Sequence, residues 1–267
     1  MNKAPLISVV MPVYNGEATV LASITSILAQ TYKNLELIVV DDQSTDGTLR
    51  LINSVRDPRV RVISHPKRNG VGAIRRFGTG HARGEYVAVL DSDDIAFPER
   101  LEAQLDYMRR NSLKLCGTWA YLVGPDGQRR EFRHPVKPED IRKNIICTNC
   151  FVHSTVMFTK EAYDLVGGYN PSPALSYVED YDLWLRMVAR YPAGNLPRIL
   201  AEYSAPKDNL RYLWREQTRT AYVRLRAILR YGYPLRSLFF VFTPLFLAFI
   251  PKKVKLLARK FLFKGSF

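Results

Sequence analysis

Short apolar runs alternate with amphipathic stretches through the first 115 residues, and this alternation limits the possible folds more than any other feature. Runs of five or six apolar residues have the length of buried strands, and apolar positions three and four apart are typical of helices. We expect strands at residues 7–12, 35–40, 59–64 and 86–90, and helices at 18–30, after Thr48, at 71–81 and at 98–111. This order predicts an α/β fold with a doubly wound, mostly parallel sheet.

The second half of the chain is less regular and predicts a mixed α+β region. Pro125-Asp-Gly127 is a strong turn signal between two strand-like runs. Short helices are expected at residues 138–146 and 160–166, and a firmer helix begins near Asp180. Residues 210–231 predict a long basic helix.

The net charge of +14 is concentrated near the carboxyl end. Residues 207–267 hold fourteen Lys or Arg against two acids, Asp208 and Glu216, so the first 206 residues are close to neutral. Proteins that bind nucleic acids carry a basic patch or stripe on the folded domain itself. This distribution therefore argues against a nucleic-acid partner. Hydrophobic residues make up 47% of the chain, which is enough for a full core.

The basic region has the pattern of a segment that lies on a membrane. Residues 238–250 are apolar but include Pro244, and thirteen helical residues span only about 20 Å, against a bilayer core of about 30 Å. Between Lys252 and Lys264, apolar and basic positions recur on opposite helix faces, which is typical of interfacial helices on anionic lipid. The alternative is that residues 238–250 pack on the body and the lysines form a solvated face.

The remaining features suggest a cytoplasmic protein. The amino terminus shows no secretory leader, and three cysteines without a completed zinc spacing are expected to be ordinary reduced thiols. Together with the basic region, this predicts a peripheral or monotopic protein at the cytoplasmic face of the cell membrane.

Two clusters of acids follow directly after expected strands. Asp41-Asp42 follows the second strand, and Asp91-Ser-Asp93-Asp94 follows the fourth. In open α/β sheets ligands bind beyond the carboxyl ends of the strands. Oxygen ligands gathered there suit Mg²⁺ or Mn²⁺, which commonly link carboxylates to substrate phosphates. The pattern predicts a site for a metal and a diphosphate, although acids at these positions also form turns and cap helices.

No glycine signature for binding phosphate competes with this interpretation. Gly70-Val-Gly72 lacks the third glycine of a dinucleotide fingerprint, and no P-loop is present. The diphosphate charge must then be met by the metal and by arginine, and Arg75 on the expected helix at 71–81 is the natural candidate.

Seven motifs in order resemble the family-2 glycosyltransferases of the GT-A fold, from about Leu6 to Tyr203. In the first half the resemblance is carried by Ser8-Val-Val-Met-Pro-Val-Tyr-Asn15, Glu36-Leu-Ile-Val-Val-Asp-Asp42 with Ser44-Thr-Asp-Gly47, Ala82-Arg-Gly-Glu-Tyr86 and Leu90-Asp-Ser-Asp-Asp94. In the acceptor half it is carried by His153-Ser-Thr-Val-Met157, Gly167-Gly-Tyr169 and Glu179-Asp-Tyr-Asp-Leu-Trp-Leu-Arg186.

The resemblance implies a role for each matching residue. Pro12, Tyr14 and Glu17 would line the nucleotide base and ribose, Asp42 would accept a hydrogen bond from the base, and Arg75 would meet the diphosphate. Asp91 and Asp93 would form the DxD element, with Asp93 the favoured metal ligand and Asp94 beside it. Asp180 would be the catalytic base of an inverting transfer, in which a carboxylate removes the proton of the attacking hydroxyl.

The chain also departs from the family at three places. Arg76 stands where the family often has Asn, and Ser204-Ala-Pro-Lys-Asp208 stands where many members have a metal-binding His. The Gln-x-x-Arg-Trp element of processive synthases is absent from the sequence, which favours transfer of a single sugar.

We therefore expect a metal-dependent glycosyltransferase that uses a nucleotide-sugar donor. Its acceptor is expected to be a saccharide, such as a lipid-linked saccharide of cell-surface polysaccharide synthesis. The predicted organisation is a GT-A catalytic domain at residues 1–206, with a nucleotide-sugar half at 1–115 and an acceptor half at 116–206, followed by a membrane-associating helical region at 207–267. The alternatives are a nucleotidyltransferase that makes sugar nucleotides and a non-catalytic membrane- or nucleic-acid-binding protein.

Overall fold

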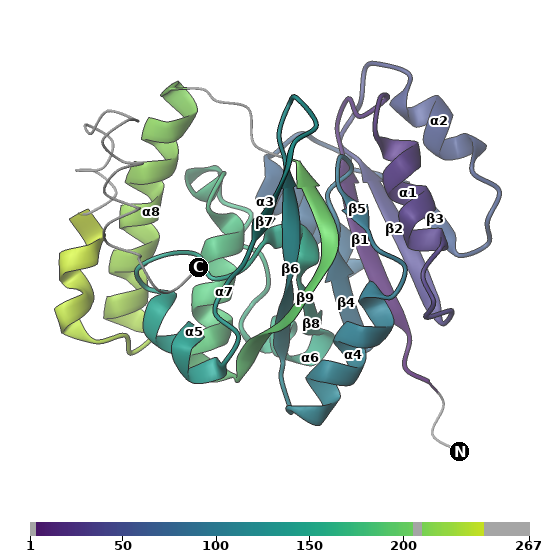
Figure 1. Cartoon of the computed structure of the whole chain (residues 1–267). Helices are drawn as coiled ribbons and strands as arrows, with labels where there is room; N and C mark the ends of the chain where they lie inside the picture. Colours follow the sequence, from purple (N-terminus) through teal and green to yellow (C-terminus); the bar gives the residue numbers. More distant parts are fainter. Residues whose placement is uncertain (1–3, 205–209, 243–267) are drawn as a thin grey trace.

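One mixed β-sheet forms the centre of the protein, with helices on both faces (Figure 1). The computed structural model describes residues 4–204 and 210–242, with the side chains of 210–214 left out. Within these residues the strand order is β3-β2-β1-β4-β8-β6-β9-β5, and β7 pairs with β6 at one edge.

The first half of the sheet is entirely parallel. It contains β1 (Ile7–Val13), β2 (Leu35–Asp41), β3 (Val60–Ser64) and β4 (Tyr86–Val89), and β1 lies between β2 and β4. The connecting helices are α1 (Val20–Leu28), α2 (Thr48–Ser54) and α3 (Val71–Gly80). Every strand of this half therefore points its carboxyl end toward the same edge of the sheet.

Antiparallel pairings join the second half to the first. Strand β8 (Met157–Thr159) runs antiparallel to both β4 and β6 (Leu115–Val123), so β6 again points the same way as β4. The long β9 (Ala193–Ser204) is parallel to β6, while β5 (Ile95–Ala96) and β7 (Arg129–Phe132) are antiparallel additions. The helices of this part are α4 (Arg100–Arg110), α5 (Pro138–Asn144), α6 (Lys160–Leu165) and α7 (Glu179–Arg190).

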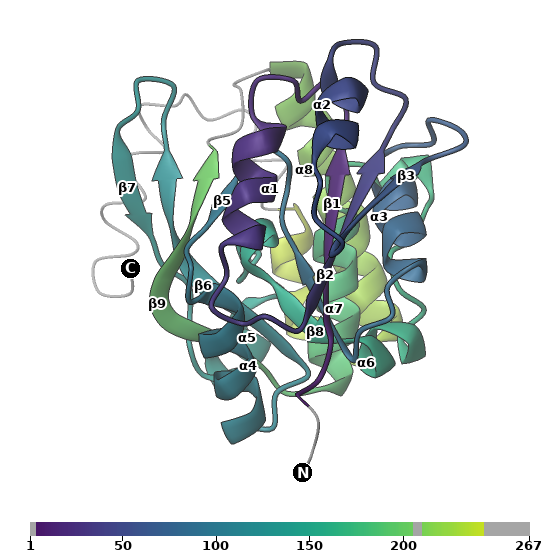
Figure 2. The same ribbon diagram turned by 90° about the vertical axis from the view of Figure 1, so that its right-hand side faces the viewer.

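Each face of the sheet has its own hydrophobic core. On one face, α1 and α4 pack against alternate residues of β1 and β2, and on the other face α3, α6 and α7 pack against the residues between them. Figure 2 shows α1 and α3 on opposite sides of these strands. Because both faces are covered, strands β1, β2 and β4 are almost wholly apolar rather than alternating.

The predicted fold class is confirmed, and most predicted elements begin or end within two residues of the observed ones. The Pro125-Asp-Gly127 turn joins β6 to β7 as expected, and Gly127 adopts a left-handed φ of 76°. Helix α4 starts at Arg100, so Pro98 precedes the helix instead of lying in its first turn. Cys116 and Cys150 are buried free thiols, and burial raises the pKa of each to about 12.

The long basic helix is present as α8 (Leu210–Arg230), and its described side chains pack against α7. A further helical segment begins at Leu238 and extends to Phe242, where the description ends. The expected amphipathic segment from Lys252 to Lys264 and most of the apolar segment at 238–250 lie outside the described residues. No helix in the described part of the chain has the length and apolar composition needed to cross a bilayer.

Gly78 tests the packing of α3 on the sheet. A Cβ at Gly78 would lie 2.7 Å from Val10 Cγ1 and 2.8 Å from Val40 Cγ2, closer than side-chain atoms can approach. We expect Gly78→Ala to lower the free energy of unfolding by about 1–3 kcal/mol. On the same helix, a Cβ at Gly80 meets nothing within 4 Å, so Gly80→Ala should be neutral or stabilising by up to about 1 kcal/mol. Urea denaturation followed by circular dichroism measures both, and equal effects would contradict this packing.

Candidate active site

The predicted site residues meet at the edge where the parallel strands end, the upper edge of the sheet in Figure 1. Tyr14 follows β1, Asp42 follows β2, and the acids from Asp91 to Asp94 follow β4. Helix α7 begins near the same edge and brings Asp180 from a distant part of the sequence. The sheet therefore collects groups that the sequence separates by more than 160 residues.

Four polar or aromatic side chains lie close together beyond the carboxyl ends of β1 and β2: Tyr14, Asp42, His65 and Arg68. The Arg68 guanidinium lies 3.7 Å from the centroid of the Tyr14 ring, and Arg68 Nε is 3.8 Å from Asp42 Oδ2. Asp42 Oδ1 also contacts His65 Nδ1 at 3.1 Å. This arrangement combines an exposed aromatic ring with a buried carboxylate that can accept a hydrogen bond.

Glu17 and Pro12 lie on the same side of the site. Glu17 Oε2 accepts a hydrogen bond from the backbone of Gly47 at 2.9 Å, which joins the loop after β1 to the loop after β2. Pro12 is half-buried within β1, where it is opposite Val40. The roles of Pro12, Tyr14, Glu17 and Asp42 toward a nucleotide stay predictions.

The acids after β4 differ strongly in their surroundings. Asp93 is exposed, and its backbone carbonyl accepts a hydrogen bond from the Ser204 hydroxyl. Asp94 is buried, and its Oδ1 accepts a hydrogen bond from the Ser204 backbone at 2.8 Å. Burial, reinforced by the charges of Asp91 and Asp93, raises the pKa of Asp94 to about 8. Ser204, which stands close to where many family members have a metal-binding His, thus holds this acidic turn from β9.

This acidic turn fits a divalent cation. Three carboxylates lie within four residues, and the pKa of Asp94 is raised mainly by burial and further by repulsion from Asp91 and Asp93. A cation would relieve this repulsion, and oxygen donors are the preferred ligands of Mg²⁺ and Mn²⁺. In the described part of the chain, no group of three or more His, Cys, Asp or Glu side chains is arranged as a complete metal shell. Such a shell needs oxygens from elsewhere, as from the phosphates of a bound nucleotide.

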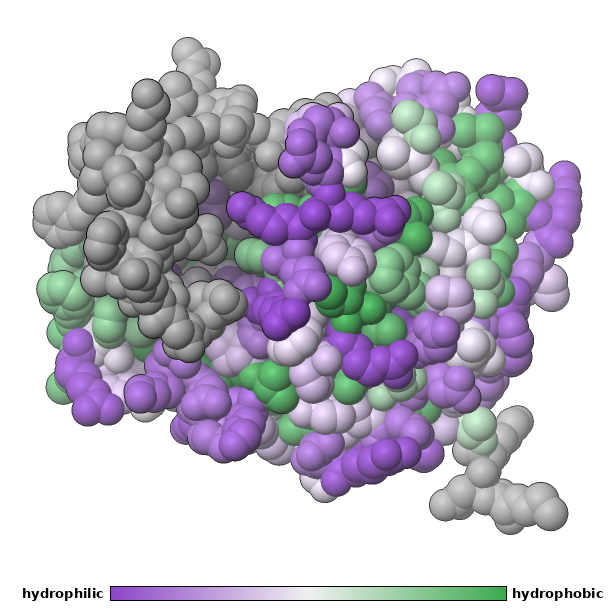
Figure 3. Space-filling view, viewed as in Figure 1, coloured by the Kyte–Doolittle hydropathy of each residue, from purple (hydrophilic) through white to green (hydrophobic). Residues whose placement is uncertain are grey.

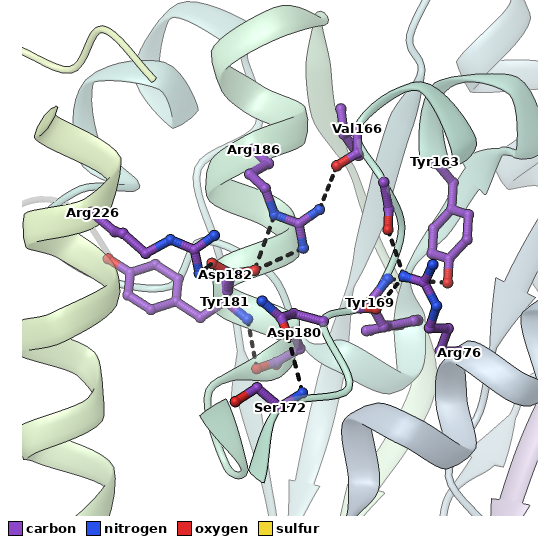
Figure 4. A network of polar contacts seen from close by, with 12 residues as sticks. Arg76, Tyr163, Val166, Tyr169, Ser172, Asp180, Tyr181, Asp182, Arg186 and Arg226 are labelled. Atoms are coloured by element: carbon purple, nitrogen blue, oxygen red, sulfur yellow. Dashed lines mark hydrogen bonds and ion pairs between the residues drawn. The ribbon is translucent and has the colours of Figure 1, made fainter. Parts of the chain in front are cut away.

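The two acids at the start of α7 have different partners. Glu179 is buried and forms an ion pair with Arg75. Asp180 is partly exposed, and its Oδ1 accepts a hydrogen bond from the backbone of Tyr181 at 2.7 Å (Figure 4). Burial raises the pKa of Asp180, whereas the nearby Arg75 guanidinium lowers it. A raised pKa makes a carboxylate a stronger base, as proton removal from a hydroxyl requires.

Arg75 connects the two acidic parts of the site. Its Nη2 donates to both carboxylate oxygens of Asp91 at 2.9 and 3.0 Å, and its Nη1 donates to Glu179. Burial would lower the pKa of Arg75, but these two carboxylates raise it overall. The sequence suggested a contact between Arg75 and a diphosphate, which stays a prediction. The ion-pair bridge from Asp91 to Glu179 was not foreseen.

His153 is a site residue for which sequence analysis gave no role, although it lies in one of the quoted motifs. Its ring lies near the rings of Tyr169 and Trp184, and its Nδ1 is 3.9 Å from Asp180 Oδ2. Neither ring nitrogen has a hydrogen bond among the described residues. Burial, with a smaller effect of Arg75, lowers the pKa of His153 to about 3. The imidazole of His153, next to Asp180, is therefore uncharged at neutral pH.

Arg76, which replaces the Asn common in the family, has a structural role here. Its Nη1 donates to the carbonyls of Gly167 at 2.7 Å and Tyr169 at 2.9 Å (Figure 4). These bonds attach α3 to the segment between α6 and α7. Arg75 and Arg76 together hold α3 against the segment that leads to Glu179 and Asp180.

Comparison with known proteins identifies the family. The profile of "Glycosyl transferase family 2" matches residues 8–164. The chain belongs to this family. EpsE of Bacillus subtilis, a glycosyltransferase by name, is 34% identical over 263 residues, which cover 95% of this chain and 93% of EpsE. A second relative is the UDP-Glc:alpha-D-GlcNAc-diphosphoundecaprenol beta-1,3-glucosyltransferase WfgD of Escherichia coli, 33% identical over 68% of this chain and 70% of WfgD.

Solved structures support the fold. TarS 1-349 of S. aureus superimposes with a TM-score of 0.69 at 20% identity, covering 98% of this chain and 75% of that one. The mannosyltransferase PcManGT of Pyrobaculum calidifontis, solved with GDP-Man and Mn²⁺, gives a TM-score of 0.68 at 18% identity, covering 98% and 82%. The protein is therefore a family-2 glycosyltransferase with the GT-A fold. The alternatives of a nucleotidyltransferase and a non-catalytic binding protein are set aside.

The Arg75 bridge predicts a large effect on stability. Removing one partner of a buried ion pair leaves the other charge without compensation, which costs about 3–5 kcal/mol. We expect Arg75→Met to lower the free energy of unfolding by this amount in urea denaturation. Arg83 is exposed, and Arg83→Met should change the free energy of unfolding by no more than about 0.5 kcal/mol. If the two variants have the same free energy of unfolding, the ion-pair bridge does not contribute strongly to the stability of the fold.

Proposed function

We propose that this glycosyltransferase moves a single sugar, with inversion, from a nucleoside-diphosphate sugar to a hydroxyl of a lipid-linked saccharide. The proposed context is the synthesis of a cell-surface polysaccharide. The acceptor class is supported by WfgD, whose name specifies a saccharide linked to undecaprenol diphosphate. ExoO of Rhizobium meliloti, a succinoglycan biosynthesis protein, is 35% identical over 60% of this chain. Each name describes that relative and supports the proposal by similarity.

Asp180 is the base in the proposed reaction. The acceptor hydroxyl attacks the anomeric carbon of the sugar from the face opposite the diphosphate and gives its proton to the Asp180 carboxylate. The bond between the anomeric carbon and the diphosphate oxygen breaks, and its electron pair leaves with the nucleoside diphosphate. The observation that carries this proposal is the position of Asp180. Its neighbour Glu179 is joined through Arg75 to Asp91 in the acidic turn after β4.

Variants of Asp180 test the base directly. Asp180→Asn keeps the size of the side chain but cannot accept the proton, so turnover should fall by about 10²-fold or more. Donor binding, measured by calorimetry with UDP- and GDP-sugars, should be nearly unchanged, because the proposed donor contacts lie on α3 and after β1, β2 and β4, whereas Asp180 lies on α7. As a control, Asp106→Asn on the exposed face of α4 should behave as wild type. Wild-type turnover by Asp180→Asn would remove Asp180 from the mechanism.

For the metal, we propose that Asp93 binds Mn²⁺ or Mg²⁺, with Asp91 and Asp94 beside it. A bound divalent cation supplies positive charge next to the leaving diphosphate. Asp93 is favoured because its side chain is exposed at the end of the sheet where a cation would bind, whereas the Asp94 side chain is buried. The Mn²⁺ in the PcManGT structure supports metal dependence within the same fold.

Asp93→Ala should therefore lose the metal-dependent part of donor binding. In thermal unfolding experiments, UDP- and GDP-sugars with Mn²⁺ should raise the melting temperature of the wild type, because a ligand that binds only the folded state stabilises it. The shift should disappear in Asp93→Ala and after addition of EDTA, but persist in Asp106→Ala. An equal shift in the presence of EDTA would argue against a metal.

We further propose that the protein is peripheral or monotopic at the cytoplasmic face of the membrane. Large apolar side chains are exposed around the end of α8, namely Leu229, Leu235, Leu238, Phe239 and Phe242. In Figure 3 apolar residues reach the surface at the left edge, over this part of the molecule. The residues that follow Phe242 are apolar and then basic, which suits an anionic lipid surface.

The exposed apolar side chains give a specific test of membrane binding. The triple variant Leu235→Ser, Phe239→Ser, Phe242→Ser should bind vesicles of phosphatidylglycerol at least about tenfold more weakly, because burial of each such side chain contributes about 1.5–3 kcal/mol. Leu165 is also exposed, at 60%, but lies on α6, and Leu165→Ser should leave vesicle binding unchanged. Vesicle flotation measures both. Equal binding by the triple variant and the wild type would place the membrane contact elsewhere.

A further inference from the structure

Helix α8 lies beyond the residues that the family profile matches, yet it contacts the start of α7 closely. The profile ends at residue 164, whereas α8 spans Leu210–Arg230. From the sequence, residues 210–231 were expected only to form a long basic helix. Among the described side chains, Arg219, Arg224 and Arg226 instead reach toward the segment that carries Glu179 and Asp180.

On the amino-terminal side of the two acids, Arg219 holds the incoming loop. Its Nη1 donates to the carbonyl of Ser176 at 2.7 Å, and its guanidinium lies 5.4 Å from the centroid of the Tyr177 ring. Tyr177 has a φ of 75°, a left-handed conformation that is costly for a residue with a large side chain. Such backbone persists only where surrounding contacts fix it, and Arg219 supplies two of them.

On the carboxyl-terminal side, two further arginines hold the first turn of α7. Arg226 Nη1 lies 3.5 Å from Asp182 Oδ1, and Arg186 binds the other oxygen of this buried carboxylate (Figure 4). Arg224 Nε donates to the Tyr181 hydroxyl at 3.1 Å, and its other nitrogens donate to backbone carbonyls of Cys147 and Phe240. Buried charges need such partners, so the turn is fixed from the side of α8.

Asp180 thus lies between two points that α8 holds, at Ser176–Tyr177 and at Tyr181–Asp182. A fourth residue of α8 also affects it, because the charge of the half-buried Glu216 carboxylate contributes to raising the pKa of Asp180. Proton transfer depends on the placement of the base, and a displacement of 1 Å can reduce the rate by about 10²-fold. The arginines of α8 can therefore affect the reaction through the placement of Asp180.

We propose that α8 positions the catalytic base, with Arg219 and Arg226 as positioning residues that fix the backbone on either side of Asp180. This inference rests on the proposed function, in which Asp180 is the base. It assigns to the carboxyl-terminal region a part in catalysis that is separate from membrane binding. Because Arg219 and Arg226 contact the residues on either side of Asp180, their loss should affect turnover more than donor binding.

The test compares Arg219→Met and Arg226→Met with Arg230→Met in steady-state kinetics. Arg230 is exposed at the end of the same helix and serves as the matched control. We expect the first two variants to lower kcat by about 10- to 100-fold, with KM for the donor nearly unchanged. Arg226→Lys keeps the positive charge beside Asp182 and should recover most of the kcat, and Arg230→Met should equal the wild type.

Three results would overturn the inference. The first is wild-type kcat in both Arg219→Met and Arg226→Met. The second is equal loss in Arg230→Met. The third is a parallel loss of kcat and donor binding with a large fall in melting temperature, which would indicate a general structural role.

Asp180→Asn separates this inference from the proposed function. If Asp180→Asn is inactive and the arginine variants are normal, only the role of α8 fails, whereas an active Asp180→Asn removes the base itself.

Discussion

The ion-pair bridge through Arg75 is the interaction on which the organisation of the site depends. The guanidinium is buried between Asp91, which follows β4, and Glu179, which begins α7. Without it, the carboxylates of Asp91 and Glu179 would lack this shared positive partner, and their repulsion would push the end of β4 away from the start of α7. One positive charge on α3 therefore joins β4 to α7 at the candidate active site.

The sheet makes this bridge possible because its parallel strands near the site end at one edge. The parallel strands β1, β2 and β4 end there, and the reversal through β8 returns β6 and β9 to the same direction. Ser204 at the end of β9 can then bind Asp94, and α7 can start beside the acidic turn. Helix α8, which lies beyond the residues that the family profile matches, also contacts the segment that carries Asp180.

Much of the fold and part of the site could be predicted from the sequence. Strands covered on both faces are largely apolar, so β1, β2 and β4 were visible as runs, and acids stood directly after the runs of β2 and β4. The Arg75–Glu179 pair joins residues 104 positions apart, and no local pattern indicates it. Likewise, Arg219 and Arg226 fit a solvated basic helix by sequence, because their partners are a backbone carbonyl and Asp182 on other elements.

The central claim is that a single carboxylate, Asp180, acts as a base and that the sugar is transferred in one displacement with inversion. The most direct measurement is the anomeric configuration of the product, determined by NMR from the coupling of the anomeric proton. A panel of UDP-glucose, UDP-GlcNAc and GDP-mannose with a diphosphoprenol-linked saccharide would supply the product. The account predicts a linkage of the configuration opposite to that of the donor sugar. A product that keeps the donor's configuration would contradict it.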